Sequence, residues 1–464
     1  MAARVWRRPE AAVAGIWALS LLPFAGTRDL YYEEGRYALA ALDMLDHGRW
    51  LRPEVLGLGF VDRPPLLLWI VALAVRIGGT SEWAIRSPAL LASLAGALLV
   101  ERAARSRGSG AAGLLAAVAF LFSPYLFTAG ARAEPDLFVT VLSFAAFTLW
   151  LRVRPAEGAA AAAGWCGVAL LLSATALLKG PQPLGYFAVG AALVAASERR
   201  PRDVGGAALA TAAAVCAVVA WGIAVYRPGD EAAWRMVSRT GSLPPPGSYL
   251  ANVLRFAAET AAHLLPWLAF AALFLSARGR RLAGLDDASG RPFVLYALGC
   301  TVPLALWPYA LPRYAMPALP AVAVLAGVAG ASLLRSGPRA ARTLTIAVVV
   351  AAFLARAAWL AAIPSDDRRN EAARRMAAGL AAPLRGTRDP ILVLGPVVDY
   401  NAAFYLRLSG FVLREVRSAA EVVAPCWLVT AGPPPEGGRE VARAADRRGR
   451  PHRLYRYEKA GPRG

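Results

Sequence analysis

The sequence has few residues of the kinds that bind transition metals or form disulfide bonds. Its 464 residues include three histidines and four cysteines, and the cysteines stand far apart without a C-x-x-C spacing. A disulfide framework and a thiolate metal site are therefore not expected. A multi-histidine zinc site is not expected either, because zinc is held by several His or Cys ligands together.

Charged residues are also scarce. They make up 18% of the chain, whereas 57% of the residues are hydrophobic and the mean hydropathy is +0.44. Ordinary soluble domains carry about 25% charged residues, so this composition indicates a membrane protein. The net charge of +20 would suggest nucleic-acid binding in a soluble chain, but the arginines gather in short gaps between apolar runs, as cytoplasmic loops do. No nucleic-acid partner is expected.

The apolar residues form runs that predict an α-helical polytopic membrane protein, most of them close to the ~20 residues that a bilayer core requires. About eleven transmembrane helices are predicted, at residues 10–26, 84–100, 110–131, 136–151, 159–178, 181–197, 205–226, 250–276, 292–309, 314–334 and 342–363. The run at residues 64–78 is short and carries Arg76. We interpret it as a helix in the outer interface.

Arginine clusters predict the orientation of these spans in the cytoplasmic (inner) membrane. A cluster before the first span places the N-terminus in the cytoplasm, and five later clusters then fall on the same side, as the positive-inside rule requires. The later clusters are Arg102, Arg105 and Arg107; Arg152 and Arg154; Arg199, Arg200 and Arg202; Arg278, Arg280 and Arg281; and Arg335, Arg339 and Arg342. The outer side receives the loops 27–83 and 227–249 and the tail.

The tail differs in kind from the rest of the chain. Short apolar runs alternate with amphipathic stretches after residue 364, which is typical of a small soluble α/β domain. We therefore expect a transmembrane domain at 1–364, with interfacial helices in its first outer loop, and an extracytoplasmic domain at 365–464.

Acidic and basic residues recur at the predicted outer ends of the spans. They are Glu33, Glu34, Arg36 and Tyr37 in the first loop; Asp62 and Arg63 before Pro64; Glu134 and Asp136 around Pro135; Lys179 before Gly180; and Arg313 with Tyr314. Each group has an ordinary explanation as a solvated loop, a helix-capping acid or a charge reaching the interface. Together they place acids and bases on one side of the membrane.

That combination suits sugar transfer from a polyprenyl phosphate. A carboxylate can take the proton of the acceptor, and cations or a metal can hold the leaving phosphate. Nucleotide sugars are absent outside the membrane, so a lipid-linked donor is the natural energy source there.

The order of these motifs across residues 10–330 resembles the integral-membrane GT-C glycosyltransferases of the protein O-mannosyltransferase and lipid A aminoarabinose transferase superfamily. Members carry an Asp-Glu-x-Arg-Tyr motif, an acid-Lys-Pro-Pro motif before an apolar-Trp helix, a Lys-Gly pair and a Tyr-x-x-Pro signature. The corresponding residues here are Glu33-Glu34-Gly35-Arg36-Tyr37, Asp62-Arg63-Pro64-Pro65 with Trp69, Lys179-Gly180 and Tyr314-Ala315-Met316-Pro317.

The resemblance implies roles for these residues. Glu33 takes the position of the family's catalytic Asp, Arg63 that of its phosphate-binding Lys, and Glu134 that of its second-loop acid. Glu34 is the alternative base. Arg36, Lys179 and Arg313 are expected to join Arg63 at the donor phosphate, with support from Tyr37, Asp62, Asp136 and Tyr314. Glu in place of Asp lengthens the side chain, whereas Arg in place of Lys supplies a bidentate fork that suits phosphate.

The function implied is inverting transfer of a sugar from a polyprenyl-phosphate donor to a lipid, glycan or protein acceptor, among membrane lipids, at the outer face. A divalent Mg²⁺ or Mn²⁺ is a possible cofactor. Two alternatives stay open: a transporter or flippase of a lipid-linked sugar, and a non-catalytic membrane scaffold. Paired repeats and ionisable groups in the middle of spans, which transporters often show, were not found in the sequence.

Overall fold

The computed structural model describes residues 9–26, 28–228, 230, 245–307, 309–362, 371–394 and 399–458. The chain divides into two compact units, which are described separately. Unit 1 consists of residues 1–23, 62–67 and 89–360, and unit 2 of residues 24–61, 68–88 and 361–464. Most of the loop 227–249, Pro308, the arginines before residue 9 and the start of the tail lie outside the described residues.

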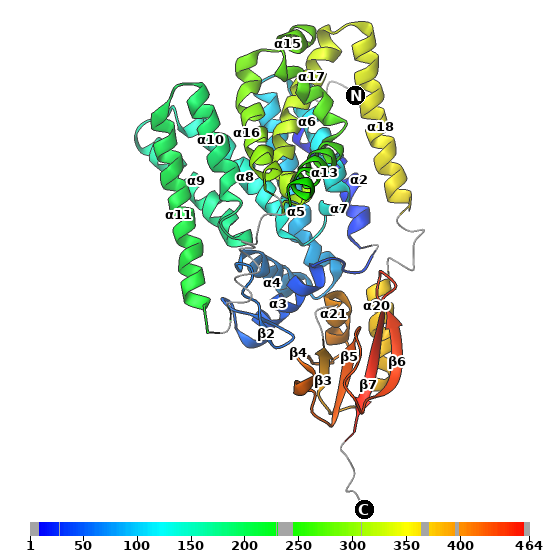
Figure 1. Ribbon diagram of the computed structural model, residues 1–464. Coiled ribbons are helices and arrows are strands. Elements are labelled where there is room, and N and C mark those ends of the chain that lie inside the picture. Colours follow the sequence, from blue (N-terminus) through cyan, green and yellow to red (C-terminus); the bar gives the residue numbers. More distant parts are fainter. Residues whose placement is uncertain are drawn as a thin grey trace, which may run out of the picture. The chain divides into compact units, whose positions relative to one another are not determined.

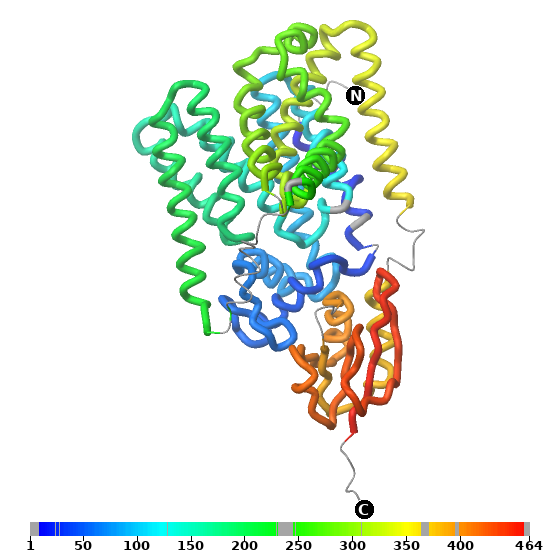
Figure 2. Tube along the Cα trace, in the orientation of Figure 1, coloured from blue at the N-terminus to red at the C-terminus, as the bar shows by residue number. Residues whose placement is uncertain are grey.

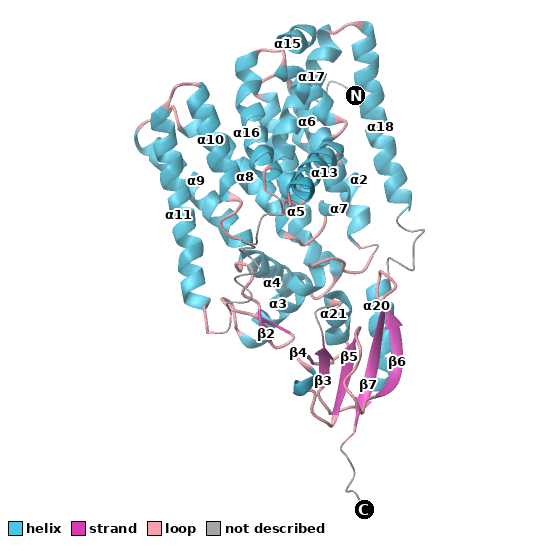
Figure 3. Cartoon of the chain, in the orientation of Figure 1, coloured by secondary structure: helices cyan, strands magenta, loops and turns pink. Residues whose placement is uncertain are grey.

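Helices dominate unit 1 (Figures 1 and 3). All eleven sequence ranges predicted as spans contain helix in the described part of the chain. The helices in those ranges are α2 (Pro9–Ala25), α5 (Glu82–Arg105), α6 (Gly110–Leu121), α7 (Pro124–Ala129), α8 (Pro135–Val153), α9 (Gly158–Lys179), α10 (Leu184–Ser197), α11 (Pro201–Val225), α13 (Pro246–Leu264), α14 (Trp267–Ala271), α16 (Asp287–Ala305), α17 (Leu319–Ser336) and α18 (Arg339–Ala362). Short helices η1 (Ala272–Leu275), α15 (Ala277–Ala283) and η2 (Pro312–Ala318) lie between them.

Six of these helical segments are long and apolar enough to cross a membrane, and the pair formed by α13 and the α14–η1 segment, bent by 94°, would make a seventh. A multi-pass membrane protein is thereby confirmed, whereas the count of eleven stays a prediction. Two predicted spans are interrupted. One break lies before α7, where Ser123 is the N-cap and Pro124 the first helical residue, and the other follows α13, just before Pro266. A helix is interrupted at such positions because proline has no backbone N–H to donate to the preceding turn.

Small residues allow the unit 1 helices to approach closely, as membrane helices commonly do. Helix α17 packs along α6, and a Cβ at Gly327 would lie 2.4 Å from the Ala112 carbonyl oxygen. Helix α10 packs along α16, where Gly299 faces the backbone of Gly190. Helices α8, α9 and α11 lie side by side in that order (Figure 1).

Helix α18 is joined to α2 by a buried arginine. Arg356 donates from Nε (3.1 Å) and Nη2 (2.5 Å) to the Ser20 carbonyl oxygen, and its guanidinium lies over the rings of Phe127 and Trp359. Arg356 is 2% exposed, although most of α18 is not buried in the protein. The contact therefore fixes the angular position of a helix that otherwise has few buried side chains.

The first part of unit 2 contains two helices and a small hairpin. Helix α3 (Glu34–His47) is followed by strands β1 (Glu54–Val55) and β2 (Leu58–Gly59), and then by α4 (Leu66–Gly78). Helix α4 covers the run that we interpret as interfacial. Its helical conformation is confirmed, and its depth in the membrane stays a prediction.

The tail forms the α/β fold that its sequence predicted, with a five-stranded mixed sheet in the order β4-β3-β5-β7-β6. The strands are β3 (Ile391–Leu394), β4 (Leu413–Val416), β5 (Cys426–Thr430), β6 (Arg439–Ala445) and β7 (Pro451–Tyr457). Strands β4, β3 and β5 are parallel, and β7 and β6 continue the sheet in antiparallel pairs. Helices α20 (Ala372–Ala381) and α21 (Tyr400–Leu408) pack on its Val393 and Val429 side.

Helix α21 also packs against α3, although the two helices are far apart in the sequence (Figure 2). The Glu415 amide donates to the Leu56 carbonyl oxygen over 2.7 Å, and Arg407 pairs with Asp46 over 2.8 Å. The tail is therefore built onto the first loop within unit 2. This association was not expected from the sequence, which suggested a separate soluble domain.

Candidate active site

The acids after the third span are placed by the start of α8. Glu134 is the N-cap residue, Pro135 occupies the first helical position, and Asp136 follows in the first turn. Proline is favoured at this position and the helix dipole stabilises acids there. Both side chains are nearly buried, with Glu134 4% and Asp136 8% exposed.

Asp136 is the centre of a polar cluster in unit 1. Its carboxylate forms an ion pair with Lys179, the last residue of α9, and lies 4.0 Å from Arg313 Nε. Gly180, with φ +91°, ends α9 directly after Lys179 and so turns the chain away from the lysine. Arg63, in the Pro-rich segment before α4, adds a further positive charge to the field at Asp136.

Aromatic groups support the cationic side of this cluster. The Lys179 ammonium lies 4.2 Å from the centroid of the Tyr314 ring, a favourable cation–π distance. Tyr314 belongs to η2, which packs against α8. The Tyr125 hydroxyl donates to the Pro312 carbonyl oxygen over 2.7 Å and holds the start of η2.

Glu134 belongs to the same cluster. It pairs with Arg132 over 3.4 Å and acts electrostatically on Arg313. The cluster thus combines four cations, Arg63, Arg132, Lys179 and Arg313, with two acids, Glu134 and Asp136. The cations still outnumber the acids if Asp62, the neighbour of Arg63 in the sequence, is counted as a third acid. The cluster therefore has an excess of positive charge that a bound phosphate can neutralise through charge-assisted hydrogen bonds. The structure therefore brings together Arg63, Glu134, Asp136, Lys179, Arg313 and Tyr314.

The predicted residues of the first motif, Glu33 to Tyr37, lie in unit 2, whereas Asp62 belongs to unit 1 with Arg63. Glu33 is the N-cap residue of α3, but its side chain makes no capping bond and is 40% exposed, 3.5 Å from Arg36. The Arg36 guanidinium lies 4.5 Å from the centroid of Phe60 and 5.6 Å from that of Tyr400. Tyr37 is buried against Phe60. Glu33 is thus a half-buried carboxylate beside a cation that aromatic rings hold in place.

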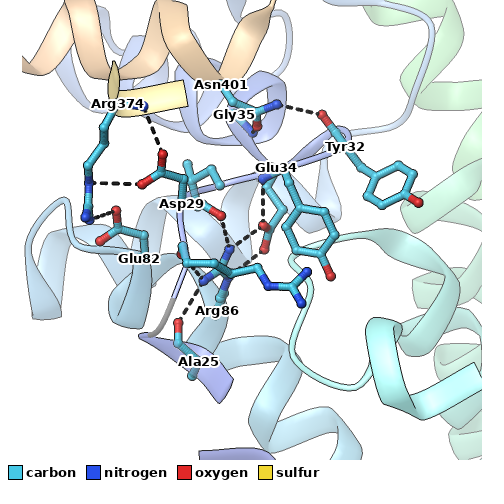
Figure 4. A network of polar contacts seen from close by, with 12 residues as sticks. Ala25, Asp29, Tyr32, Glu34, Gly35, Glu82, Arg86, Arg374 and Asn401 are labelled. Atoms are coloured by element: carbon cyan, nitrogen blue, oxygen red, sulfur yellow. Dashed lines mark hydrogen bonds and ion pairs between the residues drawn. The ribbon is translucent and has the colours of Figure 1, made fainter. Parts of the chain in front are cut away.

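Glu34 has a different environment from Glu33 (Figure 4). Its carboxylate accepts from Arg86 Nε (3.0 Å) and Nη2 (2.7 Å) and from the Tyr31 amide (3.1 Å), and both side chains of the pair are 0% exposed. A carboxylate enclosed in this way cannot reach an acceptor hydroxyl without breaking the pair. The geometry therefore favours a structural role for Glu34 over the catalytic role that the sequence suggested.

Comparisons with known proteins agree with this architecture. Residues 62–228 match the family described as dolichyl-phosphate-mannose-protein mannosyltransferase. The undecaprenyl phosphate-alpha-4-amino-4-deoxy-L-arabinose arabinosyl transferase of Pseudomonas aeruginosa (strain UCBPP-PA14) is 28% identical over 349 residues, which are 69% of this chain and 60% of that relative. The match thus leaves part of the relative's length uncovered.

Solved structures show the same fold over the full length. ArnT from Cupriavidus metallidurans in the apo state has a TM-score of 0.74 at 19% identity and covers 100% of both chains. The same protein bound to undecaprenyl phosphate has a TM-score of 0.72 at 19% identity, with 98% of both chains covered.

These similarities support the GT-C glycosyltransferase superfamily that the sequence motifs suggested. The similarity to the mannosyltransferase family covers residues 62–228, and the similarity to the aminoarabinose transferase covers 69% of the chain.

Two groups of residues in this protein were not predicted from the sequence. Arg86 lies inside a predicted span, and an ionisable residue there is a signal that could have been followed. Asn401, Tyr405 and Arg374 of the tail contact the first loop, but no local pattern marks them, because their partners lie about 300 residues or more away in the sequence.

No metal site is apparent in the described part of the chain, where no three His, Cys, Asp or Glu residues gather. Glu134 and Asp136 each face a cation instead. A bound Mg²⁺ or Mn²⁺ stays a sequence-based prediction.

Proposed function

We propose that this protein is a GT-C glycosyltransferase that moves a sugar from a polyprenyl-phosphate donor to a lipid, glycan or protein acceptor. The observation that carries this proposal is the unit 1 cluster, in which Lys179 and Arg313 converge on Asp136 at the ends of apolar helices. The phosphate of a polyprenyl donor lies where its lipid chain enters the bilayer, and a charge there must be paired with cations. The ends of apolar helices are suitable positions for such cations. The similarity to aminoarabinose transferases supports the same donor class.

The cluster would act as the phosphate site. Arg63 and Arg313 supply guanidinium forks that match phosphate oxygens, and Lys179 supplies a point charge. Asp136 and the Tyr314 ring hold the lysine in one orientation, so little rearrangement is needed when charge develops on the leaving phosphate. Asp62 and Glu134 would orient the neighbouring arginines.

Glu33 would act as the general base. Its half-buried carboxylate can accept the proton of an acceptor hydroxyl while the acceptor oxygen attacks the anomeric carbon from the face opposite the phosphate. One bond forms and the sugar–phosphate bond breaks in a single displacement, so the anomeric configuration inverts. Arg36 pairs with Glu33 over 3.5 Å and would contribute to binding the donor phosphate.

The donor sugar is either a pentose or a hexose. The relatives named as aminoarabinose transferases favour a pentose, whereas the family named for mannose transfer favours a hexose. We propose further that the reaction takes place at the outer face of the cytoplasmic membrane, because the arginine-rich loops fall on the opposite side from the motif residues.

The proposal can be tested with purified protein in lipid nanodiscs. Undecaprenyl phosphate carrying 4-amino-4-deoxy-L-arabinose or mannose would be supplied with a lipid A extract, and release of undecaprenyl phosphate would be measured by mass spectrometry. Release with one of the two donors is expected, and no release with either would contradict the proposal. If no undecaprenyl phosphate is released, but protein reconstituted in vesicles moves the donor from one leaflet to the other, the flippase alternative would be supported instead.

A further inference from the structure

The predicted catalytic segment is held at two points by one side chain of the tail. Asn401, in the first turn of α21, accepts from the Gly35 amide through Oδ1 (2.9 Å) and donates through Nδ2 to the Tyr32 carbonyl oxygen (3.1 Å). These two bonds bracket Glu33 and Glu34 along the backbone (Figure 4). We refer to this pair of bonds as the Asn401 clamp.

The backbone at the clamp is specialised for close contact. A Cβ at position 35 would lie 2.6 Å from the Asn401 Cα and 2.6 Å from the Tyr400 carbonyl oxygen, so only glycine permits this approach. Tyr32 has φ +55°, a left-handed conformation that a bulky residue rarely adopts. Such a conformation persists only where the surrounding contacts determine it, and its carbonyl oxygen is one of the two groups that Asn401 binds.

Asn401 is itself fixed within α21. The Asp399 carboxylate caps this helix by accepting from the Asn401 amide (2.9 Å) and the Ala402 amide (3.2 Å). One turn later, the Tyr405 hydroxyl donates to Glu82 (2.6 Å) and accepts from the Leu30 amide (3.0 Å). Helix α21 is therefore held on both sides of Asn401, by the Asp399 cap and by Tyr405. A mobile surface asparagine would not hold the segment 32–35 in this way.

Glu33 stands between two anchored neighbours. On its C-terminal side, Glu34 is locked to Arg86 and Gly35 to Asn401, and on its N-terminal side the Tyr32 carbonyl oxygen is bound. The backbone of Glu33 is consequently held on both sides, and its carboxylate forms an ion pair with Arg36 over 3.5 Å.

We propose that Asn401 is a positioning residue for Glu33, so that the tail completes the catalytic machinery instead of being an appended domain. This inference rests on the proposed function and on Glu33 as its base. Loss of the clamp would let the segment 32–35 relax, and a displacement of about 1 Å at a reacting group can cost on the order of 100-fold in rate.

A matched control separates positioning from simple attachment of the tail. Arg407 lies on the same helix α21 and pairs with Asp46 of α3 over 2.8 Å, but it does not touch the segment 32–35. Asn401→Ala and Arg407→Ala each remove a contact between α21 and α3. Only the first removes the clamp.

Hydrogen–deuterium exchange tests the Asn401 clamp without any substrate, because it measures how well the backbone amides near Glu33 are protected. Asn401→Ala should raise exchange in a peptide that covers residues 32–37 by about tenfold or more, whereas Arg407→Ala should leave that peptide unchanged. Equal exchange in wild type and Asn401→Ala would overturn the clamp. If Asn401→Ala fails to fold, Asn401→Asp carries the same test, because it keeps the acceptor for Gly35 and loses the donor to Tyr32.

Kinetics then test the consequence for Glu33. With the donor that the wild type uses, Asn401→Ala should lower kcat by about 10- to 100-fold and change the donor KM by less than about twofold. Arg407→Ala should keep both constants near wild type. A normal kcat in a variant with raised exchange would contradict the positioning role, and an inactive wild type would contradict the proposed function while the exchange result still decides the clamp.

Discussion

Glu34 and Arg86 form an ion pair from which solvent is completely excluded. Arg86 Nη2 lies 2.7 Å from Glu34 Oε2, and the remaining guanidinium donors bind the carbonyl oxygens of Ala25, Arg28 and Asp29. One arginine of α5 thereby ties together the end of α2, the connecting segment and the start of α3 (Figure 4). The pair serves as the internal support of the loop that carries Glu33.

Removing one partner of this pair should destabilise unit 2 strongly. Arg86→Met leaves the Glu34 carboxylate buried without its cation, and breaking a buried pair in this way typically costs about 3–5 kcal/mol. Thermal unfolding in detergent would measure the loss. Arg375→Ala is the matched control, because its pair with Glu371 is exposed on both sides and should contribute less than about 1 kcal/mol. Equal effects of the two substitutions would refute the structural role of Arg86.

Arg63 should contribute directly to donor affinity. A hydrogen bond to a charged group is worth about 1.5–3 kcal/mol, so Arg63→Ala should weaken binding of undecaprenyl phosphate by about 10- to 100-fold. Calorimetry with undecaprenyl phosphate would measure this change. Arg152→Ala, at the opposite end of α8 from Asp136, should bind the lipid normally. Unchanged affinity in the Arg63 variant would remove this residue from the phosphate site.

The stability of unit 2 should depend on pH through Asp29. Burial raises the pKa of this carboxyl to about 6, above the ordinary value of 3.8, despite its contact with Arg374. The folded protein therefore holds the proton more tightly than the unfolded chain, and this contribution to stability, present at pH 4, is lost as pH rises through 6. Relative to Asp29→Asn, wild type should thus unfold at a lower temperature at pH 7 than at pH 4.5. Parallel pH profiles for the two proteins would show that Asp29 does not titrate in this way.

The membrane orientation is a further prediction. Arginine clusters in alternate loops place the N-terminus in the cytoplasm and the tail outside. A reporter that is active only in the cytoplasm, fused after residue 464, should therefore give no signal, whereas fusion within the Arg199–Arg202 loop should give a strong one. A strong signal from the C-terminal fusion would overturn both this topology and the interfacial interpretation of residues 64–78.

The helical part of the fold was predictable because apolar runs are long and separated by charges. Breaks inside those runs were harder to predict, since Pro124 and Pro266 occur within sequences that are apolar on both sides. Proline is tolerated in many membrane helices, so its presence alone does not indicate a 94° bend.

The candidate site was predictable in part for a similar reason. Charges such as Lys179 and Asp136 are conspicuous at the ends of apolar spans, and the structure brings them together. The clamp on Gly35 was not predictable, because Asn401 is an ordinary residue in a soluble-looking helix and lies 366 positions away. A long-range hydrogen bond of this kind leaves no periodicity or local composition in either segment.

The central claim, that Glu33 is the general base, is tested most directly by measuring the turnover of Glu33→Gln. Glu33→Gln keeps the shape of the side chain and removes the base, so turnover with the accepted undecaprenyl-phosphate sugar should fall by about 100- to 10,000-fold while donor affinity stays near wild type. Near-normal turnover in Glu33→Gln, with loss of turnover in a folded Glu134→Gln or Glu34→Gln, would place the base elsewhere and contradict the account.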